Sequence, residues 1–182
     1  AIYIYAYLCV MNIAIILSGG VGTRMGEACP KQYIKVADKP IINYCVKTFC
    51  NNPRIDKIVI CLADEWRAFV EESLKDIVTT QSIIYSKPGR TRQFTIYNAL
   101  EKLESIGIAS DDVVIIHDAA RPLVSQQLID ACLDENRVCD GVLPVIPMKD
   151  TIYMSHDGKN IDALLDRNTL FAGQAPESFV FG

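Results

Sequence analysis

The residues with the clearest chemical potential lie near the start of the chain, in Ser18-Gly19-Gly20-Val21-Gly22-Thr23-Arg24-Met25-Gly26. Glycines let the backbone approach a polyanion closely, and successive free N–H groups form an anion-binding nest. Two cations, Arg24 and Lys31, add positive charge where the negative charge of phosphates would collect. We therefore expect this segment to bind a nucleoside triphosphate.

Two familiar glycine-rich loops do not match this segment. The Walker pattern requires a Lys directly after its last glycine, and no such Lys stands between Gly20 and Met25. The dinucleotide-binding pattern Gly-x-Gly-x-x-Gly fits at Gly20 and Gly22, but Met25 occupies the third glycine position. A plain strand-to-loop turn remains the alternative, because glycine chiefly marks turns.

Two later segments place polar and cationic residues where strands should end. Lys87-Pro88-Gly89-Arg90-Thr91-Arg92 leads into an expected helix, whose first N–H groups attract anions. His117-Asp118-Ala119-Ala120-Arg121-Pro122 follows an aliphatic run. Asp118 is the best candidate ligand for Mg²⁺, which takes one or two carboxylates together with phosphate oxygens and water. The alternative is a structural carboxylate that anchors the loop. Arg121 suits bidentate binding of a phosphate, and we expect His117 to be a partly buried strand-end residue rather than a base.

Strands and helices that alternate along the chain must position these segments. Continuous apolar runs such as Val113-Val114-Ile115-Ile116 are typical of parallel strands that helices cover on both faces. The expected strands are Asn12–Leu17, Lys57–Leu62, Gln81–Tyr85, Asp112–His117 and Gly141–Ile146. The expected helices are Pro40–Cys50, Asp64–Leu74, Thr91–Ser105 and Ser125–Arg137. This alternation predicts an α/β fold with a doubly wound, mostly parallel sheet, whose ligands bind beyond the carboxyl ends of the strands.

The chain after Pro147 departs from this alternation. Asp157-Gly158 lies between two extended runs, 150–155 and 160–166, which is a strong signal for a β-hairpin. We expect a projecting arm over about residues 148–168, with an ordinary edge hairpin as the alternative.

Composition limits the class of protein. The 182 residues suit one domain with a substantial core, and 50% hydrophobic with 22% charged residues is typical of a globular chain. The net charge of −4 argues against a nucleic-acid-binding surface, so any cationic site must be local. Seven cysteines without Cys-x-x-Cys spacing and only two histidines disfavour zinc and indicate reduced thiols in the cytoplasm. Residues 1–10 precede Met11 and are interpreted as an extension, with an added strand as the alternative. The uncharged run 1–17 is at the short limit for a membrane span, so we expect no membrane insertion.

Taken together, the motifs resemble those of the 2-C-methyl-D-erythritol 4-phosphate cytidylyltransferases, and almost as closely those of the related ribitol-5-phosphate cytidylyltransferases. The resemblance rests on four segments in the family's order, Ser18–Gly26, Pro30–Tyr33, His117–Pro122 and Met148–Thr151. It implies a single Rossmann-like nucleotidyltransferase domain over residues 11–182. It also implies an activity, the transfer of CMP from CTP to a phosphorylated polyol with release of pyrophosphate.

The resemblance further implies roles for individual residues. Those expected to hold the triphosphate are Ser18, Gly19, Gly20 and Gly22, while Arg24 and Lys31 stabilise the transition state and the departing pyrophosphate. The cytosine and ribose would be held by Gly89, Arg90 and Thr95. Asp118 would bind Mg²⁺ between the phosphates, and the polyol phosphate would be contacted by Asp118, Arg121, Thr151 and Arg167. The family's arm reaches into a partner subunit, which implies a homodimer with shared sites through residues 148–168.

Three departures from the family pattern bear on activity and substrate. Gln174-Ala175-Pro176-Glu177 replaces the usual Gln-Thr-Pro-Gln, which removes a hydroxyl and adds a negative charge near the expected acceptor site. Arg90 stands where an acidic residue is common. The chain ends at Gly182, before an Asp and a Lys with which family members complete the site, so we expect a C-terminal truncation.

The first choice of acceptor is 2-C-methyl-D-erythritol 4-phosphate, in isoprene biosynthesis. Gly-Gly-x-Gly-Thr-Arg in the first loop favours the ribitol branch, whereas His-Asp-Ala-Ala-Arg-Pro favours the methylerythritol branch. Ribitol 5-phosphate, in surface-polysaccharide synthesis, is therefore the alternative acceptor. A transferase for another nucleotide base, and a catalytically silent nucleotide-binding or dimerisation module, are the remaining alternatives.

Overall fold

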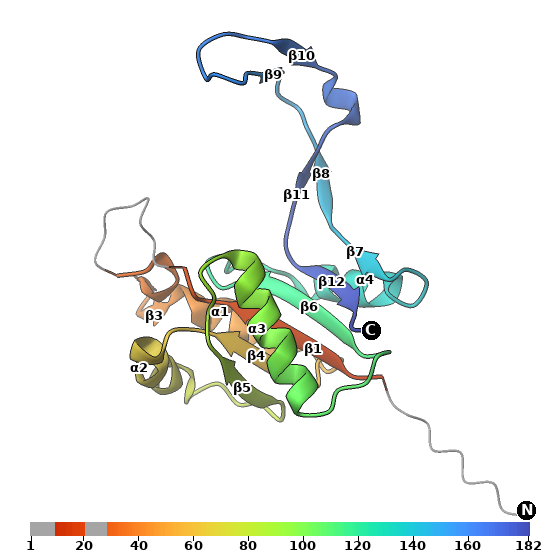
Figure 1. Ribbon diagram of the computed structural model, residues 1–182. Coiled ribbons are helices and arrows are strands. Elements are labelled where there is room, and N and C mark those ends of the chain that lie inside the picture. Colours follow the sequence, from red (N-terminus) through yellow and green to blue (C-terminus); the bar gives the residue numbers. More distant parts are fainter. Residues whose placement is uncertain (1–9, 21–28) are drawn as a thin grey trace, which may run out of the picture.

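A six-stranded sheet forms the centre of the computed structural model, which describes residues 10–20 and 29–182 (Figure 1). Its strand order is β5-β4-β1-β6-β12-β7. The first four strands run parallel to one another, β12 pairs antiparallel with β6, and β7 pairs antiparallel with β12 at the edge. The strands are β1 (Asn12–Leu17), β4 (Lys57–Cys61), β5 (Ser82–Ser86), β6 (Val113–Asp118), β7 (Gly141–Val142) and β12 (Glu177–Val180). The predicted α/β fold with a mostly parallel sheet is thereby confirmed.

Helices connect the parallel strands close to the predicted positions. They are α1 (Ile41–Cys50), α2 (Asp64–Leu74), α3 (Arg92–Ser105) and α4 (Gln126–Glu135). The hydroxyls of Thr91 and Ser125 accept hydrogen bonds from the backbone N–H groups of Phe94 and Leu128, and these N-caps fix where α3 and α4 begin. In the part of the chain that the structure describes, no helix is both long and apolar enough to cross a membrane.

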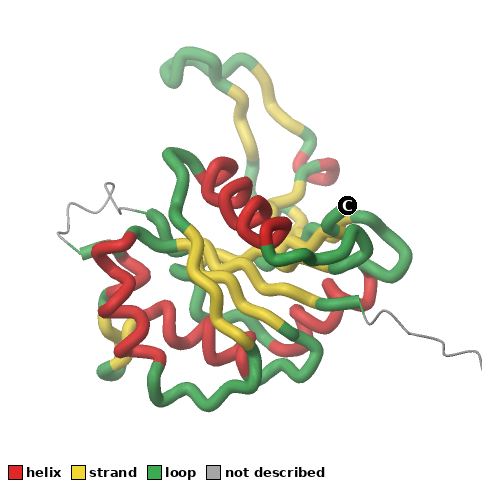
Figure 2. Tube along the Cα trace, turned by 60° about the horizontal axis from the view of Figure 1, so that its bottom comes forward, coloured by secondary structure: helices red, strands yellow, loops and turns green. Residues whose placement is uncertain are grey.

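The two faces of the sheet carry different helices, as the tube in Figure 2 shows. Successive residues of β1 alternate between them, because side chains of a strand point to opposite sides. Ala14 and Ile16 pack with Phe49 of α1 in a cluster that also includes residues of α2 and α4. Ile13 and Ile15 pack with Leu103 of α3 in a second cluster on the other face. Both faces of β1 are therefore fully buried, which explains its unbroken apolar sequence.

The strand order reverses beside β1. The chain proceeds from β1 to β4 and β5 on one side and then returns to place β6 on the other side of β1. In doubly wound folds, the loops that leave the strands at such a reversal diverge to opposite faces and leave a crevice at the carboxyl ends. The carboxyl ends of β1 and β6 are Leu17 and Asp118, which pair with each other in register.

Two parts of the sheet differ from the prediction. The expected strand Gly141–Ile146 is wrong as a single element: it divides into β7 and the separate β8 (Val145–Pro147), with Pro144 between them. Proline cannot donate a hydrogen bond to a sheet, so it interrupts the strand here. β12 was not predicted; it enters the sheet between β6 and the edge strand β7.

The arm projects away from the sheet as two successive antiparallel pairs (Figure 1). β8 pairs with β11 (Phe171–Gly173) near the base, and β9 (Ile152–Met154) pairs with β10 (Ala163–Leu165) further out. Asp157 and Gly158 lie in the turn between β9 and β10, where Gly158 has a φ of +71°. The carboxylate of Asp157 accepts hydrogen bonds from the backbone N–H groups of Lys159 and Asn160, which hold the pKa of this carboxyl below its ordinary value. The hairpin predicted from Asp-Gly is therefore present, with shorter strands than expected.

Candidate active site

A cavity of about 680 Å³ opens at the carboxyl ends of β1 and β6. Its walls come from the glycine-rich loop, the segment before α3 and the loop after β6, which are the three segments singled out in the sequence. The predicted site residues that line it are Gly19, Gly20, Lys31, Gly89, Arg90, Thr95, Asp118 and Arg121. Arg24 and Gly22 lie outside the described residues.

Side chains of the short 3₁₀ helix η2 (Lys31–Tyr33) hold the start of the glycine-rich loop in place. Gln32 Nε2 donates hydrogen bonds to the backbone carbonyls of Ser18 and Gly20, at 2.8 and 2.9 Å. The Ser18 hydroxyl donates to the Tyr33 hydroxyl at 2.9 Å, and burial raises the pKa of Tyr33. Ser18 is buried and does not line the cavity, so its side chain fixes the loop instead of facing a ligand.

The segment before α3 approaches that helix so closely that only glycine fits. A Cβ on Gly89 would lie 2.3 Å from Phe94 Cβ and 2.8 Å from the backbone nitrogen of Thr95. The Gly89 N–H donates to Thr95 Oγ1 at 3.0 Å, and Thr95 Oγ1 in turn donates to the Thr91 carbonyl at 3.0 Å. Gly89 and Thr95, which the resemblance pairs as nucleotide contacts, are therefore held together at the N-terminal end of α3.

Cations dominate the charge of the cavity wall. Among the described lining residues, Lys31, Arg90, Arg92 and Arg121 are cationic, and Asp118 is the one carboxylate. Asp118 Oδ2 accepts a hydrogen bond from Arg121 Nε at 3.1 Å, and Asp118 Oδ1 lies 3.6 Å from Arg92 Nε. Excess positive charge beside the N-terminus of a helix suits a polyphosphate.

The donor set of this cavity fits Mg²⁺ only together with a phosphate ligand. No group of three His, Cys, Asp or Glu residues that could hold a metal occurs in residues 10–20 and 29–182. Asp118, however, presents a carboxylate at the cavity wall, and Mg²⁺ is commonly held by one or two carboxylates with substrate phosphates and water. The site is thus compatible with a metal that arrives with the nucleotide.

His117 is buried directly beneath this loop. Its Nε2 lies 2.9 Å from the Arg121 carbonyl, and its Nδ1 has no hydrogen-bond partner within the described chain. Burial lowers the pKa of His117 below its ordinary value, against the opposing effects of the Arg121 hydrogen bond and of Asp118. The neutral ring therefore supports the turn that presents Asp118 and Arg121, which agrees with a strand-end role rather than that of a base.

Thr151 and Arg167 do not join the cavity within one chain. They line a separate hollow of about 350 Å³ on the arm, together with Asp166 and Asn168. Arg167, at the start of the 3₁₀ helix η3 (Arg167–Thr169), donates to the Lys149 carbonyl through Nη1 at 2.9 Å. The expected polyol-phosphate contacts are therefore divided between the domain and the arm.

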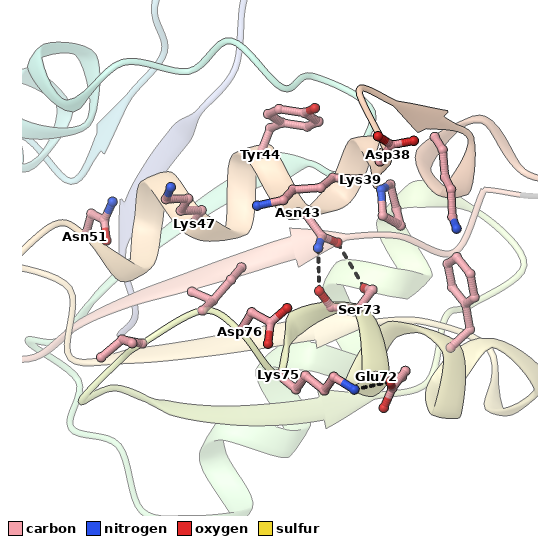
Figure 3. A pocket seen from close by; sticks show the side chains of 15 residues that line it. Asp38, Lys39, Asn43, Tyr44, Lys47, Asn51, Glu72, Ser73, Lys75 and Asp76 are labelled. Carbon is pink, nitrogen blue, oxygen red and sulfur yellow. Dashed lines mark hydrogen bonds and ion pairs between the residues drawn. The ribbon is translucent and has the colours of Figure 1, made fainter.

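A second cavity of about 640 Å³ lies between α1, α2 and the small hairpin of β2 (Lys35–Val36) and β3 (Lys39–Pro40) (Figure 3). Asn43 and Ser73 hydrogen-bond each other on its floor, and the charges around it include both signs. None of the three predicted segments contributes to it, so it is not the expected nucleotide site.

Comparison with known protein families shows which class of enzyme this chain belongs to. A sequence profile described as IspD, 2-C-methyl-D-erythritol 4-phosphate cytidylyltransferase, matches residues 12–182. The chain belongs to this family. It is therefore a cytidylyltransferase-family enzyme, in agreement with the resemblance drawn from the motifs.

Individual relatives carry two different names. Ribitol-5-phosphate cytidylyltransferase of Streptococcus agalactiae serotype Ia is 33% identical over 171 residues, which cover 93% of this chain and 71% of the relative. The crystal structure of Francisella tularensis 2-C-methyl-D-erythritol 4-phosphate cytidylyltransferase has a TM-score of 0.74 and 28% identity, covering 94% of this chain and 73% of that one. A crystal structure of 4-diphosphocytidyl-2C-methyl-D-erythritol synthase has a TM-score of 0.78 and 25% identity, covering 96% and 77% of the two chains.

Sequence reasoning left three residues of the site unassigned. Gln32 lies in the segment Pro30–Tyr33 and Arg92 in Lys87–Arg92, two segments already predicted to belong to the site. The clustering of polar and cationic residues in these segments is the sequence feature that could have indicated a role for both. Glu177 was noted only as a departure from the family, yet its Oε1 lies 3.3 Å from Arg92 Nη2. No sequence signal could have paired Glu177 with Arg92, because the unpredicted β12 brings them together.

Proposed function

We propose that this enzyme transfers CMP from CTP to a phosphorylated polyol in the cavity at the ends of β1 and β6. The observation that carries the proposal is the convergence of three separate motifs on one cationic cavity. In the reaction, a phosphate oxygen of the acceptor attacks the α-phosphorus of CTP. The bond from that phosphorus to the bridging oxygen breaks, and pyrophosphate leaves with the electron pair.

Catalysis of this kind rests on positioning and on charge. Lys31 lines the cavity and is held next to Gln32, which binds the glycine-rich loop, so it is suited to stabilise charge that develops around the α-phosphate. We assign the same role to Arg24. We assign binding of the nucleoside to Gly89, Arg90 and Thr95. A bound Mg²⁺ would neutralise phosphate charge, and Asp118 is the residue that would hold it. An attacking phosphate is already anionic, so no residue has to act as a base.

We propose ribitol 5-phosphate as the acceptor. The support is the 33% identity to ribitol-5-phosphate cytidylyltransferases over nearly the whole chain, which exceeds the identity of the quoted methylerythritol enzymes. The glycine-rich loop favours the same branch. 2-C-methyl-D-erythritol 4-phosphate, the first choice from the motifs, is the second candidate, and the family profile and the His117–Pro122 motif favour it.

We further propose a homodimer in which the arm completes a partner's site. Large apolar side chains on the arm are more than half exposed, including Tyr153, Ile161 and Leu164. Surfaces of this kind mark protein–protein contacts. The separation of Thr151 and Arg167 from the cavity has the same explanation, because a partner's arm would supply them there. In this arrangement residues 11–182 form one catalytic domain, with the arm at 148–168.

Release of pyrophosphate tests the reaction class. Each of the four nucleoside triphosphates is supplied with Mg²⁺ and with either ribitol 5-phosphate or 2-C-methyl-D-erythritol 4-phosphate. The expected result is release with CTP and ribitol 5-phosphate above all other combinations. Release with another nucleotide would overturn the assignment of CTP. Binding of CTP without release with either acceptor would favour a silent nucleotide-binding module.

A further inference from the structure

Glu177 lies beside the cavity without lining it. It begins β12, where it pairs with Ile116 of β6 in the antiparallel register. Side chains alternate along a strand, and Phe179 packs with Ile116 in the cluster that α3 covers, so Glu177 also faces α3. Asp118, two residues beyond Ile116, faces the same side. The carboxylates of Glu177 and Asp118 therefore approach the N-terminal end of α3 from neighbouring strands.

Arg92 lies between these two carboxylates. Its Nη2 is 3.3 Å from Glu177 Oε1 and its Nε is 3.6 Å from Asp118 Oδ1. Arg92 also lines the cavity, whereas Glu177 does not. The other oxygen of Asp118 already accepts from Arg121. Two guanidinium groups thus share Asp118, and Glu177 is a second anionic partner for one of them.

We propose that Glu177 is a positioning residue that acts through Arg92, holding its guanidinium at the cavity wall to face the polyphosphate. Without Glu177, Asp118 is the one anionic partner left for Arg92 within the described chain. Arg92 would then compete for the Asp118 carboxylate with any metal ion that binds there. With Glu177 present, the guanidinium of Arg92 keeps one ion pair when the Asp118 carboxylate binds a metal ion instead. The inference rests on the proposed function for the identity of the ligand, but it concerns only the triphosphate part. It also accounts for an acidic residue at the position where the family pattern has Gln.

A double-mutant cycle on the full chain tests this coupling. Binding of inorganic tripolyphosphate with Mg²⁺ is measured by calorimetry for Glu177→Gln, Arg92→Gln and the double variant. We expect Glu177→Gln to weaken binding about two- to five-fold, the value of a partly exposed ion pair. Arg92→Gln should weaken it about ten-fold or more, because a charge-assisted contact to phosphate is lost. In the Arg92→Gln background, Glu177→Gln should have no further effect. Glu104→Gln, on the exposed side of α3, is the matched control.

A charge swap separates positioning from a merely structural ion pair. The double variant Arg92→Glu/Glu177→Arg retains opposite charges at these two positions, but it also places a carboxylate beside Asp118, so its melting temperature should recover only in part. Its tripolyphosphate binding should stay at least about ten-fold weaker, because a carboxylate now lines the cavity. Recovery of both properties would overturn the proposal, as would an equal effect of Glu177→Gln in both backgrounds or no effect in the wild type.

The probe keeps this inference distinct from the proposed function. Tripolyphosphate is common to every nucleoside triphosphate, so coupling can be observed whichever base the enzyme uses. Coupling without transfer of CMP would refute the proposed function alone. Transfer of CMP without coupling would refute the positioning role alone.

Discussion

Replacement of Gly89 by alanine should disable the enzyme through geometry alone. The new Cβ would lie 2.3 Å from Phe94 Cβ and 2.5 Å from the Phe94 carbonyl carbon, whereas ordinary contact begins at 3.4 Å. Two of the three clashing atoms are backbone and the third is a Cβ attached directly to it, so no side-chain rotation relieves them. The first turn of α3 must therefore move by about 1 Å, and a misplacement of this size can lower the rate about 100-fold.

The same displacement should reduce stability by about 1–3 kcal/mol, the usual cost of overpacking. Pyrophosphate release and thermal unfolding measure the two effects, and calorimetry with CTP shows whether binding is lost in the folded variant. Gly20→Ala is the matched control for stability, because a Cβ at Gly20 meets nothing within 4 Å. Wild-type activity and an unchanged melting temperature in Gly89→Ala would refute the close approach on which the argument depends.

Four further outcomes follow from the site. Lys31→Ala should lower turnover about 100-fold or more, as loss of one transition-state donor does, and near-normal turnover would refute its role. Asp118→Asn should raise the Mg²⁺ concentration needed for half-maximal rate at least about ten-fold, measured by titration. Burial lowers the pKa of His117 in the folded protein below its ordinary value of 6.5, so the unfolded chain binds the proton more tightly. Stability from the neutral ring is therefore complete above about pH 6.5 and is progressively lost as pH falls from there through the folded pKa. Denaturant unfolding should show this loss in the wild type and not in His117→Gln. Finally, mixing Lys31→Ala with Arg167→Ala should restore about one quarter of the activity, because half of the random dimers carry one intact shared site; no restoration would contradict sharing.

The parallel part of the fold could be predicted because its inner strands β1, β4 and β6 are buried on both faces. β1 carries an unbroken aliphatic run, and α2 has the predicted bounds, since local patterns determine both. β12 could not be predicted in the same way. The pairing of β12 with β6 joins residues that are about sixty positions apart in the chain. The local sequence of β12 contains no signal for pairing with β6.

The site was predictable to the extent that it consists of strand ends and glycines. Parallel topology brings Gly19, Gly89 and Asp118 to the carboxyl edge of the sheet. Glycines and a carboxylate at that edge indicate binding of phosphates and of a metal ion. The contact of Ser18 with the nucleotide stays a prediction; its hydroxyl donates to Tyr33, because a buried polar group needs a partner. The partners of Arg92 depend on β12, so they became visible only in three dimensions.

The most direct test of the account is a competition between the two acceptors. The enzyme receives CTP, Mg²⁺ and equal concentrations of ribitol 5-phosphate and 2-C-methyl-D-erythritol 4-phosphate, and mass spectrometry measures the products at early times. The account predicts CDP-ribitol in excess of CDP-methylerythritol, with pyrophosphate equal to their sum. An excess of CDP-methylerythritol would contradict the proposed acceptor, and the absence of both products would contradict the proposed transfer of CMP.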